Sequence, residues 1–161
     1  MNLRNRFKGL QALFKIPKAA GDSYNIYLYL QGITKETGNL NRLIRCTDYD
    51  HGFHMSGGIS PKPEFTGMTI KKPVDRHSPP LALAALTNLT IPTMTLYFYC
   101  TRTSQVRHML LMHNITIKSV KQHIGQSGKG FSETLVLIFT KIQWNFGTAS
   151  AGWDLLKNQP T

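Results

Sequence analysis

The segment FTGMTIKKPVDRHSPPLALAALTN, from Phe65 to Asn88, is the most informative part of the sequence because it joins a short strand to a capped helix. Residues 68–71 can run extended, and Pro73 stops ladder pairing because it lacks an N–H. Ser78 stands where a helix N-cap belongs, and the two prolines after it fall in the first turn, where a missing N–H costs nothing. The apolar body of this helix is supplied by Leu81, Leu83, Ala84 and Leu86. A strand, a turn and a helix are therefore predicted here.

Around this segment the hydrophobic pattern changes to a period of two, which is typical of half-buried strands. The expected strands are Tyr24–Gln31, Arg42–Tyr49, Ile91–Arg102, Val106–Lys121 and Phe131–Phe146. The glycines and prolines between Met55 and Pro63 predict an irregular connection. With long strands and one confident internal helix, we expect a mainly β fold. It should have two antiparallel sheets that form a compact β-barrel or sandwich with one flanking α-helix.

The first 22 residues differ from the rest of the chain and are assigned as a leader, with residues 23–161 as a single domain. Leu3, Phe7, Leu10 and Phe14 follow helical spacing with cations between them, which indicates a short basic amphipathic helix. Such a helix could bind a membrane surface or a partner. The alternative is a tail that frays in solution, or extra residues from an upstream start codon.

The charge is strongly positive, with 19 Lys and Arg against 8 Asp and Glu and a formal net charge of +11. This imbalance raises nucleic acid, anionic lipid and acidic protein as partners. No complete secretory signal opens the sequence, and no transmembrane run is present. Cys46 and Cys100 are therefore expected to be reduced thiols in a cytoplasm.

The sequence offers only weak evidence for a catalytic or metal site. The GQSGKG loop at residues 125–130 lacks the glycine spacing and the Ser or Thr of a phosphate-binding loop, and a strand follows it, so a hairpin loop is preferred. His51 and His54 have a spacing that could bind zinc on a helix, but the neighbouring glycines favour a solvated strand end. No nucleophile motif appears. We expect no enzyme activity, no metal and no cofactor.

A nucleic-acid surface is the main alternative function from the residues alone. Lys71-Lys72, Arg102 and Arg107, with nearby Tyr97, Phe98 and Tyr99, could form a basic aromatic face for single-stranded nucleic acid on a monomeric β-barrel. Without an RNP-like signature, a solvated rim with tyrosines at an interface is the preferred interpretation.

Several landmarks, kept in order between Tyr24 and Asn158, resemble the Hcp family, the ring-forming tube proteins of bacterial type VI secretion systems. They are IYLYLQGITKETG, YDHGFHMSGG, the Phe65–Asn88 segment, LYFYCTRTSQ, FSETLVLIFTKIQWNF and ASAGWDLLKNQ. The basic leader and the cationic body depart from the usual family pattern.

The resemblance implies a hexameric homo-oligomeric ring that stacks into a tube, and an extended loop that reaches a neighbouring subunit. It also implies spike, contractile sheath and effector proteins as partners, and export without a cleaved signal peptide after assembly in the cytoplasm. Ring-interface candidates are Tyr27, Tyr29, Tyr97 and Tyr99. Arg42 and Arg45 are hypothesised to favour acidic cargo if they lie on the strand that borders the lumen.

Overall fold

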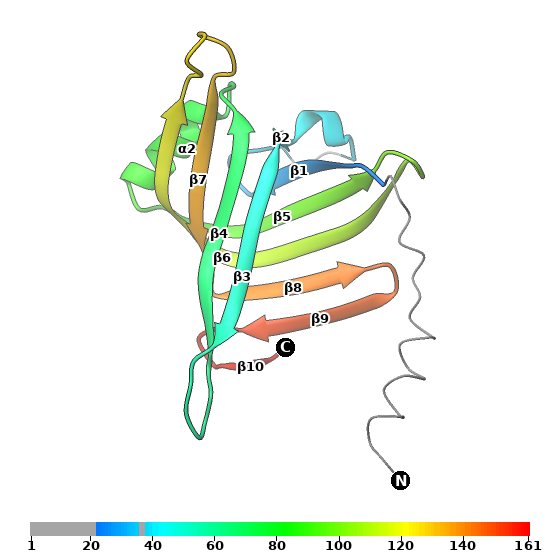
Figure 1. The fold of residues 1–161 in the computed structure, drawn as a ribbon, viewed down its shortest axis with the longest axis vertical. Coiled ribbons are helices and arrows are strands. Elements are labelled where there is room, and N and C mark those ends of the chain that lie inside the picture. Colours follow the sequence, from blue (N-terminus) through cyan, green and yellow to red (C-terminus); the bar gives the residue numbers. More distant parts are fainter. Residues whose placement is uncertain (1–21, 36–37) are drawn as a thin grey trace.

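The computed structural model describes residues 22–35 and 38–161, and Figure 1 shows their arrangement. The leader therefore lies almost wholly outside the described residues. In chain order the elements are β1 (Tyr24–Leu30), the 3-10 helix η1 (Leu40–Arg42), β2 (Ile44–Cys46), β3 (Asp48–Met55), β4 (Pro63–Pro73), α2 (Ser78–Leu86), β5 (Thr90–Cys100), β6 (Gln105–His123), β7 (Ser132–Ile138), β8 (Lys141–Phe146), β9 (Ala149–Asp154) and β10 (Gln159–Pro160). The predicted fold class, mainly antiparallel β with one flanking α-helix, is confirmed.

Strand β6 is shared by the two sheet layers. One layer has the order β10-β9-β8-β6-β5-β1-β2, and a branch of β3, β4 and β7 forms the other layer. Residues 108–113 of β6 pair with β8, whereas residues 116–123 pair with β7. Figure 1 shows β3 and β4 crossing over β5, β6 and β8, so the two layers pack face to face at a steep angle.

The core lies between these layers and uses the inward positions that the alternation predicts. Leu28 and Leu30 of β1 and Met94 and Leu96 of β5 are fully buried. Burying each large apolar side chain stabilises the fold by roughly 1.5–3 kcal/mol. The hydrophobic period is therefore enough to orient β1 and β5.

Helix α2 is confirmed, but its N-cap is one residue earlier than predicted. His77 occupies the N-cap position without a side-chain capping bond, and Ser78 is the first helical residue. The Ser78 hydroxyl accepts from the backbone N–H of Asp75 and donates to Glu133, so it caps the preceding turn instead. At the other end Asn88 adopts a positive φ of 51°, typical of a residue that terminates a helix.

Two predicted strands are wrong in extent. The Phe131–Phe146 segment is split into β7 and β8, because Phe139 and Thr140 turn the chain from pairing with β4 to pairing with β9. The buried positions change phase at this bend, from Leu135, Leu137 and Phe139 to Ile142, and the prediction of a single strand overlooked this change. The Arg42–Tyr49 segment is likewise divided among η1, β2 and β3.

A β-bulge lies at Gly67, where the β3–β4 hairpin leaves the body of the domain. On β3 a single residue, Gly52, lies between His51 and Phe53. On β4 two residues, Thr66 and Gly67, lie between their partners Met68 and Phe65, so β4 has one extra residue here. Gly67 has a φ of 82°, and a Cβ atom there would lie 2.8 Å from the backbone oxygen of Leu137. The left-handed backbone and the close approach both require glycine.

Replacing Gly67 with alanine is expected to lower the free energy of unfolding by about 1–2 kcal/mol, from the positive φ alone, with a further cost from the contact. Gly52→Ala is the matched control because open space surrounds its Cβ position and its φ is not positive. Urea denaturation of both variants measures the difference. Equal stability of the two variants would contradict the role assigned to this bulge.

Candidate functional site

The four candidate tyrosines lie together on one face of the sheet, called here the tyrosine face (Tyr27, Tyr29, Tyr97 and Tyr99). Tyr27 pairs directly with Tyr97 across β1 and β5, while Tyr29 pairs with Thr95 and Tyr99 with Asn25. These residues alternate with the core residues, so the tyrosine face points away from the β3–β4–β7 layer. Tyr29, Tyr97 and Tyr99 are half-buried, which leaves part of each ring accessible.

The segment before η1 covers part of the tyrosine face. Tyr27 is only 9% exposed, although it is on the outer side of the sheet. Residues 38–41 and the rings of Tyr27 and Tyr99 line a hollow of about 370 Å³. Two of the four interface candidates therefore also border a cavity, which the sequence pattern did not predict.

Arg42 and Arg45 are not neighbours on one strand, so the premise of the cargo hypothesis is wrong for Arg42. Arg45 is in β2, pairs with Tyr27 and donates a hydrogen bond of 3.3 Å to Asn25 Oδ1, beside the tyrosine face. Arg42 ends η1 and lines a separate pocket with Arg76. A helical turn within a segment predicted to be extended causes this separation.

The β3–β4 hairpin projects beyond the rest of the domain (Figure 1). It carries exposed apolar side chains. Its two strands are joined by residues 56–62, and the N–H of Ser56 donates to the Lys62 carbonyl at 2.8 Å. The exposed fractions are 55% for Phe53, 53% for Met55 and 105% for Ile59. Exposed apolar side chains on a projecting hairpin are candidates for contact with another protein.

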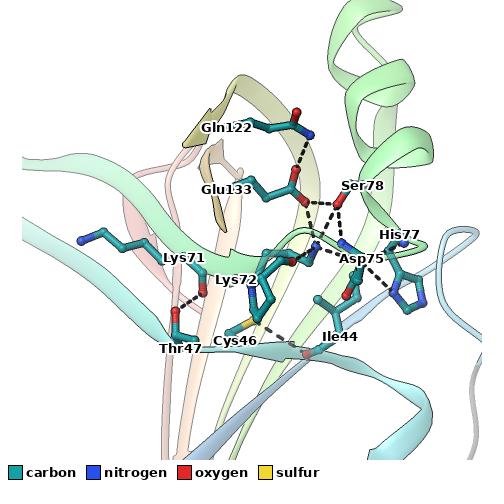
Figure 2. A network of polar contacts seen from close by, with 11 residues as sticks. Ile44, Cys46, Thr47, Lys71, Lys72, Asp75, His77, Ser78, Gln122 and Glu133 are labelled. Carbon is teal, nitrogen blue, oxygen red and sulfur yellow. Dashed lines mark hydrogen bonds and ion pairs between the residues drawn. The ribbon is translucent and has the colours of Figure 1, made fainter. Parts of the chain in front are cut away.

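Lys72 forms a buried polar network that the sequence did not reveal (Figure 2). Its side chain is 0% exposed, and Nζ lies 2.7 Å from Glu133 Oε1, 3.0 Å from Asp75 Oδ1 and 2.8 Å from the Pro73 carbonyl. Ser78 at the start of α2 donates to Glu133 at 2.7 Å. The network therefore ties β4, β7 and the N-terminus of α2 together.

The carboxylates of this network are held in the ionised form. Burial raises the pKa of Glu133, but hydrogen bonds from Lys72, Ser78 and Gln122 outweigh it, so the pKa is lower than usual. The pKa of Asp75 is lowered in the same way, since bonds from Lys72 and the His77 N–H exceed the effect of burial. Lowered carboxylate pKa values contribute stability above the unfolded-state pKa values, and this contribution is lost as the pH falls through the folded values.

His51 is part of an aromatic cluster, not of a solvated strand end as predicted. Its ring stacks on Phe65 and Trp144 with centroid distances of 6.1 and 6.3 Å, and it meets Phe139 edge-on at 5.7 Å. His54 instead lies 3.2 Å from Glu64. Within residues 22–35 and 38–161, no group of three His, Cys, Asp or Glu side chains could hold a metal ion.

Acidification below about pH 6.5 is expected to destabilise the protein through His51. Burial lowers the pKa of His51 below 6.5, more than the Gly67 backbone and Asp50 raise it. The unfolded state then binds more protons, so the free energy of unfolding falls as the pH drops from 6.5 toward the folded pKa. Urea denaturation between pH 7.5 and 5 measures the slope.

His51→Phe should reduce this slope, because phenylalanine keeps the aromatic packing and cannot take up a proton. His123→Phe, at an exposed position, is the matched control. A slope that is unchanged in His51→Phe would refute the assignment.

The proposed nucleic-acid surface loses several of its members. Lys72 is fully buried, and Phe98 is part of the core with 6% exposure. Lys71 pairs with Asp48 at 3.6 Å, and Arg102 pairs with Asp22. These contacts leave fewer basic and aromatic groups free to bind nucleic acid.

These features define a class of protein: an antiparallel two-layer β protein with one flanking helix, a projecting β3–β4 hairpin and an outer sheet face that carries the four tyrosines. The family model described as type VI secretion system effector, Hcp, matches residues 27–146. The chain belongs to the Hcp family of type VI secretion proteins.

Several solved Hcp structures have the same fold as this chain. Hcp1 from Salmonella typhimurium has a TM-score of 0.75 and 21% identity, covering 86% of this chain and 99% of that one. Hcp2 from the same organism has a TM-score of 0.67 and 22% identity, with 84% and 99% covered. The secreted protein Hcp3 from Pseudomonas aeruginosa has a TM-score of 0.70 and 14% identity, with 82% and 98% covered. The comparison with curated proteins gave no match.

In the described part of the chain, no helix has the length and apolar character needed to cross a membrane.

Proposed function

We propose that the chain is a structural subunit of the type VI secretion inner tube. Six copies form a hexameric ring, rings stack into a tube, and the lumen carries effector proteins. The observation that carries this proposal is the projecting β3–β4 hairpin, whose exposed Phe53, Met55 and Ile59 need a partner surface. Membership of the Hcp family supports the same assignment.

The geometry suits a head-to-tail contact between copies. A hairpin that inserts against a different surface of the next subunit gives a heterologous contact, which forms a ring when the rotation closes. Among the described strands β3 pairs only with β4, so its other edge is open for hydrogen bonding. The tyrosine face offers half-buried aromatic rings of the kind enriched at interfaces. Function then resides in surfaces that bind proteins, without a catalytic step.

Cargo contact and export complete the proposal. Arg45 beside the tyrosine face, and Arg42 from its separate position, attract acidic cargo by long-range electrostatics. The subunit assembles in the bacterial cytoplasm and is exported with the spike and the contractile sheath as partners, without a cleaved signal peptide.

The test is the size and shape of the purified full-length protein. Light scattering should give a mass of about six times 18.2 kDa, and negative-stain electron microscopy should show annular particles. A protein that stays monomeric at high concentration, with no annular particles, would refute the proposal.

A further inference from the structure

A basic pocket lies between the β1–η1 connection and the turn that precedes α2. Its volume is about 530 Å³, within the range of binding sites for small ligands and short peptides. The pocket is lined by Ile33, Lys35, Arg42, Arg76, His77 and Pro80. None of the functions proposed above uses this pocket as a binding site.

The positive charge of the basic pocket is not neutralised by the described residues. Lys35, Arg42 and Arg76 make no ion pair with any residue in the described ranges. The nearby carboxylate of Asp75 is engaged by Lys72 at 3.0 Å and by the His77 N–H at 2.8 Å. Lys35, Arg42 and Arg76 therefore line one cavity without an ion-pair partner among the described residues, while His77 lies 3.4 Å from Asp75. The three cations favour an anionic ligand.

The backbone around the basic pocket argues against a cradle for a compact phosphate. Such a cradle uses free N–H groups at a helix N-terminus. Here the Ser78 N–H donates to the Asp75 carbonyl, the Leu81 N–H to the His77 carbonyl, and the two intervening prolines have none. Recognition must come from side chains on three separate segments.

Cations that come from three separate segments suit an extended ligand with several carboxylates. Ile33 and Pro80 add apolar surface for the methylene groups of acidic side chains.

We propose that the basic pocket binds an acidic, Glu- or Asp-rich segment of a different protein. A second copy of this chain is a poor source, because six of its seven described carboxylates lie within ion-pair distance of a cation or a histidine. The eighth carboxylate of the sequence, Glu36, lies outside the described residues. Because the pocket is built from one chain, the proposal does not depend on ring formation.

Fluorescence anisotropy with labelled hexaglutamate tests the proposal on the full-length protein at low and physiological salt. The wild type should bind this peptide, and a hexaglutamine peptide should not bind. Arg42→Gln combined with Arg76→Gln should weaken binding by about tenfold to a hundredfold, since two charge-assisted contacts are lost. Arg107→Gln combined with Lys129→Gln removes the same net charge from exposed positions elsewhere and should change affinity less than about threefold.

Circular dichroism should show that both double variants remain folded, since all four side chains are exposed. Equal losses in the two double variants would reduce the effect to overall charge and overturn the proposal. The absence of hexaglutamate binding to the wild type would also overturn it. If pyrophosphate displaces the peptide at concentrations where glutarate does not, the ligand is a compact phosphate, and the peptide assignment fails. None of these results bears on ring assembly, which light scattering measures separately.

Discussion

Replacing Lys72 with alanine is expected to lower the free energy of unfolding by about 3–5 kcal/mol, because it removes one partner of a buried ion pair. Glu133 is only 1% exposed and would lose the 2.7 Å contact to Lys72 Nζ, which leaves a buried carboxyl without its cation. The start of α2 would lose its link to β4 at the same time. Guanidinium denaturation followed by circular dichroism measures this loss.

Two control variants separate burial from charge. Lys71→Ala removes the adjacent lysine, whose side chain is 56% exposed and pairs with Asp48, so a change below about 1 kcal/mol is expected. Lys72→Met combined with Glu133→Leu replaces the buried pair by apolar side chains and should recover most of the lost stability. If Lys71→Ala and Lys72→Ala destabilise equally, the network is not the source of the effect.

Replacing Ile59 and Met55 with aspartate is expected to convert the proposed rings into monomers of 18.2 kDa. Both side chains are more than half exposed on the β3–β4 hairpin, so the monomer should tolerate the change. At an interface the same change buries unpaired charges, which costs several kcal/mol per contact and is repeated at every contact of a ring. Light scattering and negative-stain microscopy report the change in mass and the loss of annular particles.

Leu86→Asp is the matched control for the hairpin variant, because Leu86 is 85% exposed on α2, away from the hairpin. This control should assemble like the wild type. Rings that persist in the Ile59 and Met55 variant would exclude the hairpin as the contact while leaving ring formation itself intact. A monomeric wild type would instead refute the tube proposal.

Local patterns in the sequence predicted the strands, the helix and the placement of the core, because each depends on periodicity within a few residues. Leu28, Leu96 and the helix that begins at Ser78 are examples. The landmarks of the Hcp family were also recognisable, and the family is confirmed. The tyrosine face followed from the same alternation on β1 and β5, while its role at an interface stays a prediction.

Contacts between distant segments could not be predicted in the same way. Lys72 stands next to Lys71 in an apparently exposed pair, and its burial depends on Glu133, which is 61 residues away. Arg42 and Arg76 line the same pocket because of a 3-10 turn at the start of a segment that was predicted to be a strand.

The shared strand β6 also has a consequence for biosynthesis. Its ladder partners β7 and β8 are completed only at Phe146, and β4 pairs with β7 as well as with β3. A nascent chain that has emerged only as far as β6 has no partner for one edge of that strand, and the β3–β4 hairpin has no sheet to join. The domain therefore reaches its native state only after nearly all of its residues have left the ribosome, and until then the emerged strands have unpaired edges that are open to aggregation.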